Sequence, residues 1–382
     1  MTVGRHIGRG RQAASWSRAR QERDRRRPVI AAAVVGLLLA ALLTAPVGAW
    51  AGPSVAGVQP ASTKTTSVLR ALLIRVYWST PDTDSFADFT ARFDGVDQWY
   101  QASSYGAQSV VSTVMPNELK IAGPSSPDCW ADNAQSQAIL TQAEAAATTA
   151  GYRPDDYDRT IVYFPRADCG SDQPGAWADQ PGRTVWLDGF NQFGVVDYDV
   201  ATIVHELGHT FGLSHSVQSN CTDPTTGQPS VFGPRADCGG SSGTEFPENW
   251  FDTMGNAGSA WSFSAPVKDK LGWLTGHKIA VHPGSTVTVK PLEVSSAADA
   301  AYLTTPTGRQ YWFEFRQLVG VDATFLAPVT QGLLINVVDP TYDAGPMLLD
   351  MNPATADYID ATLNAGQSWT SPDGYVLSLI HI

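Results

Sequence analysis

Residues 205–215 read HELGHTFGLSH, and the interpretation of the whole chain starts from this stretch. His205 and His209 are four residues apart, so on a helix their side chains project from the same side, one turn above the other. Two imidazole nitrogens can then reach one metal ion at about 2.0 to 2.1 Å. Gly212 lies where the chain must leave the helix, because glycine accepts the left-handed conformation that turns the chain back and brings in His215. The spacing therefore predicts a metal site with three histidine ligands.

Glu206 is the acidic residue of this stretch and follows the first histidine directly. Three protein ligands leave one open position on tetrahedral zinc for a water molecule. The Glu206 side chain cannot easily share the direction of His205, so it suits the role of a base toward that water better than coordination. The ordinary alternative, in which these histidines are core or surface residues, fits poorly, because three of the seven histidines fall in this stretch with Glu and Gly at the required places. No comparable context surrounds the remaining histidines, which are His6, His277, His282 and His381.

Apolar residues at helical spacing precede the motif, so a helix from about Asp197 should hold it against a core. Further upstream, runs rich in Leu, Ile and Val alternate with helical patterns up to about residue 212. This alternation predicts an α/β domain, which we assign to residues 68–276. The expected strands cover residues 68–78, 108–115, 159–164 and 183–187, and the expected helices cover the segment from Phe86 to Trp99 and residues 134–150.

Beyond Gly272 the pattern changes to short β-type runs broken by Pro, Gly and Asp. We place a boundary near residue 277 and predict a small all-β domain over residues 277–382. Its last six residues, LSLIHI, can be encoded by a transposase end sequence used in sequencing libraries, so we expect this domain to be truncated and its natural form to continue beyond Ile382. The expected strands cover Val287 and Val289, then residues 311–315, 332–338 and 358–363.

The first 51 residues differ in kind from the rest of the chain. Their Arg-rich head carries a net charge of about +7, and no charged residue occurs from Val29 to Trp50. A basic head, an apolar run and the small-residue site Ala49-Trp50-Ala51 form the layout of a secretory signal peptide over residues 1–51. An uncleaved signal anchor is the alternative, because a run of this length can span a bilayer. Either interpretation places the rest of the chain outside the cytoplasm. We therefore expect a secreted, extracellular protein, which would be membrane-anchored only if the signal segment stays uncleaved. Residues 52–67 are expected to form a linker.

The net charge and the cysteine content bear on the binding partners and on the cellular compartment of the protein. The net charge of −12 for the whole chain leaves about −19 on residues 52–382, which argues against nucleic acid as a partner. All four cysteines lie in the exported part, and an even count in an oxidising compartment predicts two disulfides with three possible connectivities. Sequence neighbours favour Cys129 with Cys169 and Cys221 with Cys238. A four-cysteine metal site is the alternative, but no CxxC spacing supports it.

The extended pattern HExxHxxGxxH resembles that of the metzincin clan of zinc endopeptidases, in which a turn containing methionine follows. Residues 250–255 read WFDTMG and look like that turn. Within the clan, the chain is most similar to the gametolysin family, through YQASSYG at 100–106, FSAP at 263–266 and LGWL at 271–274.

The resemblance implies a metzincin-like catalytic domain, with a twisted mixed sheet, an active-site helix, a bound Zn²⁺ and Met254 beneath the three imidazoles as a hydrophobic base. Asp252 is expected to stabilise the turn by hydrogen bonds rather than to act in catalysis. Some metzincins have a further tyrosine ligand two residues after the turn methionine. Asn256 stands at that position here, so we expect three histidines and water only. Other metzincins are kept inactive by a cysteine in their propeptide. Residues 52–128 contain no cysteine, so we do not expect this switch here.

Motif and resemblance together predict a monomeric zinc endopeptidase that hydrolyses extracellular or cell-wall proteins, with a protein or peptide as its partner. Glu206 would take the proton of the water and return it to the leaving amine. The strand at 183–187 is either an edge strand that pairs with extended substrate or an ordinary edge strand, and its Trp186 is a candidate subsite residue. The competing class is a non-catalytic zinc-containing protein that binds the cell wall or surface, although binding alone has no use for a base beside zinc. A zinc-stabilised structural protein would prefer four protein ligands.

Overall fold

The computed structural model describes residues 67–380, apart from positions 83, 127, 130–132, 166–167, 170–174, 190–198, 235–236, 239–247, 256–258, 343–344 and 356–357. The expected signal segment and nearly all of the expected linker lie outside these residues, as do Asn256 and the expected helix start near Asp197. Within the described part of the chain, no helix is long and apolar enough to cross a membrane.

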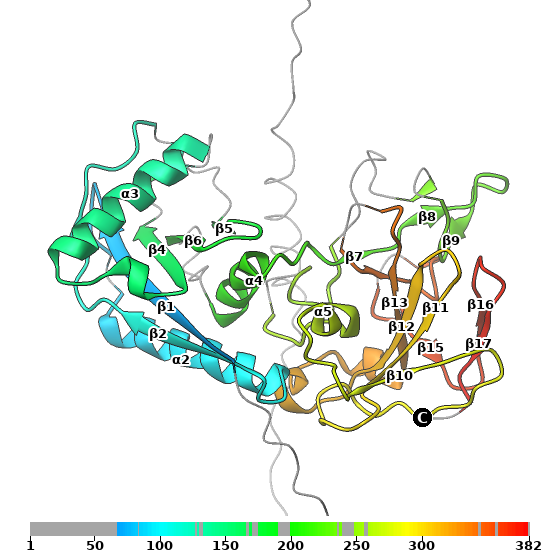
Figure 1. Cartoon of the computed structure of the whole chain (residues 1–382). Coiled ribbons are helices and arrows are strands. Elements are labelled where there is room, and N and C mark those ends of the chain that lie inside the picture. Colours follow the sequence, from blue (N-terminus) through cyan, green and yellow to red (C-terminus); the bar gives the residue numbers. More distant parts are fainter. Residues whose placement is uncertain are drawn as a thin grey trace, which may run out of the picture. The chain divides into compact units, whose positions relative to one another are not determined.

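The first sheet is mixed, as expected (Figure 1). Along it lie β2 (Gln108–Val114), β1 (Ser67–Tyr77), β4 (Arg159–Pro165), β6 (Thr184–Gly189) and β5 (Ala176–Ala178), with β3 (Leu119–Lys120) beside β1. All of these pairings are parallel except the antiparallel pair of β5 and β6. Strands in a parallel sheet are buried on both faces, which explains why β1 is a nearly unbroken apolar run.

The prediction that residues 183–187 form an edge strand was wrong. Residues 184–187 belong to β6, which has β4 on one side and β5 on the other. The three residues of β5, Ala-Trp-Ala, are too few to show a strand pattern in the sequence, so the real edge of the sheet could not be recognised there.

Helices cover both faces of the first sheet. Helices α2 (Phe86–Ser103) and α4 (Val200–Thr210) share a hydrophobic core with one face, and α3 (Asn133–Thr149) packs on the other. The alternation of side chains along β1 assigns these faces, because successive residues of a strand point to opposite sides. Leu69 and Leu73 lie in the core with α2 and α4, whereas Leu72 and Ile74 lie with α3.

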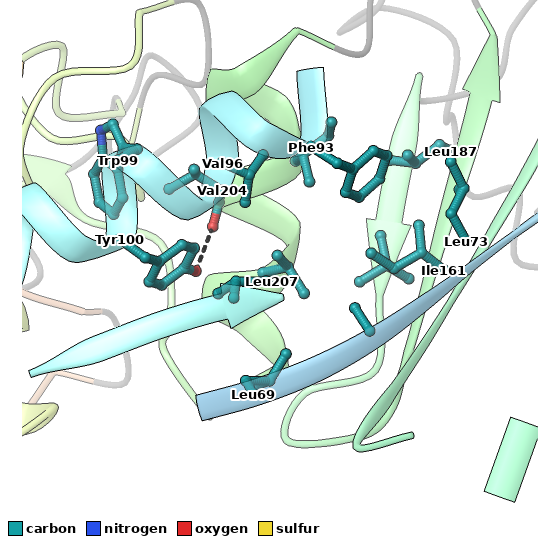
Figure 2. Close-up of a cluster of buried hydrophobic side chains, with 14 of the residues drawn as sticks. Leu69, Leu73, Phe93, Val96, Trp99, Tyr100, Ile161, Leu187, Val204 and Leu207 are labelled. Carbon is teal, nitrogen blue, oxygen red and sulfur yellow. Dashed lines mark hydrogen bonds between the residues drawn. The ribbon is translucent and has the colours of Figure 1, made fainter. Parts of the chain in front are cut away.

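The contact between α2 and α4 fixes the helix that carries the histidine motif (Figure 2). Ser85 caps the start of helix α2, and its side chain forms a reciprocal capping box with Asp88. Its buried residues recur at the three- and four-residue spacing that the sequence predicted. Near its end, the Tyr100 hydroxyl donates a hydrogen bond of 3.2 Å to the carbonyl oxygen of Val204 in α4, and Figure 2 shows this bond beside the apolar contacts. The buried hydroxyl thereby ties α4 to α2.

A second sheet holds most of the C-terminal strands and one strand from before position 277. Its strands are β10 (Lys278–Ala280), β11 (Ala300–Thr304), β12 (Gln310–Phe315), β13 (Gly332–Val338), β14 (Met347–Leu348) and β7 (Val217–Gln218), with β15 (Leu363–Asn364) beside β13. Strand β7 lies directly after the histidine motif and pairs parallel with β14. Two small ribbons, β8 (Cys221–Thr222) with β9 (Pro229–Ser230) and β16 (Ser368–Thr370) with β17 (Val376–Ser378), and helix α5 (Ala265–Lys270) complete the elements discussed below.

Two of the expected C-terminal strands differ from the structure. The backbone around Val287 and Val289 is irregular, and Val287 is exposed, because no neighbouring strand pairs with this run in the described residues. Of residues 358–363, only Leu363 joins a strand, since the chain turns at the Asp360 carboxylate, which accepts a hydrogen bond from Asn352. An apolar run in the sequence forms a strand only where the fold places another strand beside it.

Both expected disulfides are present. Cys129 is bonded to Cys169, and Cys221 is bonded to Cys238. The second bridge closes a loop between the histidine motif and the methionine-containing turn.

Candidate metal centre

Helix α4 presents the first part of the motif because both of its ends are defined by local chemistry. Asp199 caps the start, and its carboxylate accepts a hydrogen bond of 2.9 Å from the amide of Thr202. At the other end Gly212 adopts a φ of +84°, as the sequence predicted, and turns the chain back. The apolar side chains of Ile203 and Leu207 are fully buried in the core with α2 and the first sheet. The helix is therefore fixed both in extent and in rotation.

The three histidines of the motif converge on one point. Nε2 of His205 lies 3.1 Å from Nε2 of His209 and 3.2 Å from Nε2 of His215. One ligand atom from each of the three residues lies within 4.8 Å of the others. Two nitrogen ligands of one tetrahedral zinc ion, each at about 2.0 to 2.1 Å, are separated by about 3.3 Å. The observed separations fit that arrangement closely.

The proton positions on two of these rings also fit a metal ion. Nδ1 of His205 lies 2.7 Å from the carbonyl oxygen of Thr253, and Nδ1 of His209 lies 2.8 Å from that of Leu213. A carbonyl oxygen only accepts, so each Nδ1 must carry the donated proton. Burial lowers the pKa of His205 to about 3 and that of His209 to about 4, so both rings are neutral near pH 7 and their Nε2 atoms are bare lone pairs. Two bare lone pairs at 3.1 Å repel each other unless a cation lies between them.

Glu206 lies with His209 and His215 in the wall of a cleft of about 590 Å³. Its side chain is buried, and its Oε2 atom has no hydrogen-bond partner among the described residues. Burial raises the pKa of this carboxyl to about 8. The remaining wall comes from β5 with the residues after it, from the first turn of α3 and from Trp186. The buried carboxyl group of Glu206 therefore lies beside two of the histidines in the wall of the cleft, with one oxygen that has no hydrogen-bond partner among the described residues.

Met254 packs against the helix that carries His205 and His209. Its side chain is fully buried, and a Cβ atom added to Gly208 would lie only 2.3 Å from its sulfur. Asp252 stabilises the turn as expected, because its carboxylate accepts hydrogen bonds from the Met254 amide at 2.8 Å, from the Ser264 amide at 3.0 Å and from the Ser216 hydroxyl at 2.7 Å.

Two residues of the site escaped the sequence analysis. Gly208 permits the close approach of Met254, and the available signal was a glycine inside a helix, where it costs about 1 kcal/mol relative to alanine. Thr253 orients His205, but it acts through its backbone carbonyl, so its side-chain type carries no signal. Trp186, a proposed subsite residue, does line the cleft, although it is almost fully buried.

Two solved structures resemble about half of this chain, at low sequence identity. No curated protein sequence matches the chain. The crystal structure of archaemetzincin from Methanopyrus kandleri is similar at 16% identity and a TM-score of 0.28, over 54% of this chain and 95% of that chain. A structure described as a chaperone–substrate complex is similar at 14% identity and a TM-score of 0.30, over 53% of this chain and 33% of that chain. At these TM-scores neither likeness bears on the fold or the function of this chain.

A family model carries more information. The model for reprolysin-like metallopeptidases of family M12B matches residues 110–244, which include the whole histidine motif. This match and the three converging histidines support a metallopeptidase domain in this part of the chain.

Proposed function

We propose that the chain is a secreted zinc endopeptidase of the gametolysin type that hydrolyses extracellular or cell-wall proteins. The observation that carries this proposal is the convergence of three Nε2 atoms beside a buried carboxylate at the wall of one cleft. A structural zinc site would offer four protein ligands, whereas the described residues offer three here. An open coordination position is the feature that distinguishes catalytic from structural zinc.

His205, His209 and His215 are the proposed metal ligands, and Glu206 is the proposed general base. Bound zinc would supply Lewis-acid polarisation of the scissile carbonyl and would acidify a water molecule. In its ionised form Glu206 would accept the proton of that water and then return it to the leaving amine, and the Glu206 carboxyl group lies in the wall of the cleft. The hydrogen bonds at Nδ1 of His205 and His209 keep both rings in the tautomer that a metal requires.

Strand β5 is the proposed binding strand for an extended substrate. It lies at the end of the first sheet, and its three residues line the cleft, so its outer edge is open to another strand in the described part of the chain. Trp177 of β5 stacks on Trp186 with ring centroids 5.9 Å apart. This aromatic pair favours an apolar substrate side chain next to the strand.

Secretion is proposed from the N-terminal sequence, in which an Arg-rich head, an uncharged run and a small-residue site follow one another. Two disulfides use all four cysteines, which suits an oxidising compartment. N-terminal sequencing of material from the culture medium tests this proposal, and mature protein should begin near Gly52. A start at Met1 would contradict cleavage.

A pair of variants separates the peptidase from a binding protein on the same fold. Glu206→Ala removes no proposed ligand, so zinc stoichiometry and folding should stay near those of wild type, while hydrolysis of a peptide library falls by about 10² to 10⁴. His209→Ala should lose both zinc and activity. Glu144→Ala, which removes a carboxylate on α3 away from the motif, should change neither. Zinc binding by wild type without any cleavage in the library would favour the binding protein instead.

A further inference from the structure

The second sheet reaches the third histidine of the motif through its backbone. The Gly345 amide, just before β14, donates a hydrogen bond of 3.1 Å to the carbonyl oxygen of His215. Two more bonds continue this pairing, from the Val217 amide to Pro346 at 2.9 Å and from the Ser219 amide to Leu348 at 2.7 Å. The segment that leaves the metal centre is therefore hydrogen-bonded to the C-terminal sheet at every second residue from His215 to Ser219.

The contact at Gly345 leaves no room for a side chain. A Cβ atom at this position would lie 2.3 Å from the carbonyl oxygen of His215 and 3.2 Å from that of Ser214. Both atoms belong to the backbone, so no change of side-chain rotamer can relieve the clash. The glycine is needed here for close approach and not for a left-handed φ, because its φ lies outside that region.

His215 depends on this backbone contact more than the other two histidines do. The rings of His205 and His209 are each held by a hydrogen bond from Nδ1 to a carbonyl oxygen. His215 is exposed, and among the described residues its Nδ1 atom has no hydrogen-bond partner. The position of its ring is therefore set by the backbone on either side.

That backbone lies between two supports. On one side, the Ser216 amide donates a hydrogen bond of 3.0 Å to the Met254 carbonyl oxygen in the methionine-containing turn. On the other side are Gly345 and β14. Removing either support would let the third ligand move relative to His205 and His209.

We infer that Gly345 is a positioning residue for the metal centre, through which the second sheet holds His215 in place as the third ligand. The inference rests on the proposed zinc site and goes beyond it, because it assigns the C-terminal sheet a role in metal affinity. Groups that orient a metal ligand typically contribute 10- to 100-fold to metal affinity.

The test compares two glycine-to-alanine variants of the full-length chain in zinc titrations against a chelator of known affinity. Gly345→Ala should weaken zinc binding by about 10- to 100-fold. Gly233→Ala is the matched control, because it lies in the loop between His215 and the methionine-containing turn, has no positive φ, and its added Cβ would have its nearest neighbour at 3.8 Å. Its zinc affinity should stay within about threefold of wild type. The Co²⁺ forms add a spectroscopic signature, since a displaced third ligand should change the visible absorption of Gly345→Ala but not that of Gly233→Ala.

Hydrogen exchange of wild type keeps the inference testable if Gly345→Ala does not fold. Coupling between two sites is reciprocal, so if the sheet favours zinc, zinc must favour the sheet. Zinc should slow amide exchange at Val217, Ser219 and Gly345, and should leave the ribbon of β16 and β17 unchanged. Protection of residues 205–215 alone, or equal zinc affinity in the two glycine variants, would overturn the inference while leaving the zinc site intact. Failure of wild type to bind zinc at all would instead overturn the proposed function and this inference with it.

Discussion

The metal centre has two halves that are built differently. His205, Glu206 and His209 stand within one turn of α4, so their relative positions follow from the geometry of a helix. His215 and Met254 stand in irregular backbone, on either side of a long polar loop. Within the helical half, the relative positions of the side chains are set by near neighbours in sequence, whereas those of the other half, which we call the loop half, are set by residues far along the chain. The loop half therefore depends on contacts with distant parts of the chain for its position.

Arg316 shows how far the supports of the loop half extend. Its guanidinium is fully buried and donates a hydrogen bond of 3.1 Å to the Phe251 carbonyl oxygen, at the start of the methionine-containing turn. The same group is paired with Asp322 at 2.5 and 2.7 Å and with Glu314 at 3.3 Å. Glu314 in turn accepts a hydrogen bond of 2.5 Å from the Ala265 amide at the start of α5. One buried cation directly after β12 of the second sheet thus joins several backbone segments around the turn.

Removing this cation should have the largest effect on the molecule. Arg316→Met leaves the buried carboxylates of Asp322 and Glu314 without their partner, so we expect the free energy of unfolding to fall by about 3 to 5 kcal/mol. Urea denaturation measures this loss. Arg153→Met is the control, since it removes only an exposed pair with Asp156 and should change stability by less than about 0.5 kcal/mol. A loss below about 1 kcal/mol for Arg316→Met would show that the second sheet does not support the turn.

The two disulfides sharpen the comparison, because one lies in the loop half and the other lies outside the centre. Replacing both Cys129 and Cys169 by serine opens a 40-residue loop and should cost about 4 kcal/mol, and replacing Cys221 and Cys238 opens a 17-residue loop and should cost about 3 kcal/mol. The effect on zinc affinity should be larger for the 221–238 bridge than for the 129–169 bridge. Zinc affinity should weaken when the 221–238 bridge is lost, since that bridge closes the segment between His215 and the turn, and should hold when the 129–169 bridge is lost. Equal zinc affinities in the two folded variants would remove the distinction between the halves.

The same division explains what the sequence could predict. The motif predicted the helix, the glycine that ends it and the three converging histidines, because spacing along a helix is a local property. The α/β alternation predicted β1, β2, β4 and β6 of the first sheet but not the short β3 and β5, so it placed the edge of the sheet at β6 instead of at β5. Neither Gly345 nor Arg316 could be recognised, because each acts on backbone atoms far away in sequence and nothing near it in the chain signals that contact.

The smallest expected effect concerns the contact between Gly208 of the helical half and Met254 of the loop half. Gly208→Ala should by itself favour α4 by about 1 kcal/mol, because alanine is the better helix former. The added Cβ would lie 2.3 Å from the Met254 sulfur, and overpacking of this kind costs about 1 to 3 kcal/mol. We therefore expect a net loss of stability of up to about 2 kcal/mol in thermal or urea unfolding.

A double-mutant cycle assigns that loss to its cause. In the background of Met254→Ala the obstructing side chain is absent, so adding Gly208→Ala should now stabilise the protein by about 1 kcal/mol. The change of sign is the critical result, because helix propensity is the same in both backgrounds and only the contact between helix and turn differs. If Gly208→Ala destabilised both backgrounds equally, the two halves would not meet at this glycine. The close packing of α4 on the methionine-containing turn would then have to depend on other residues.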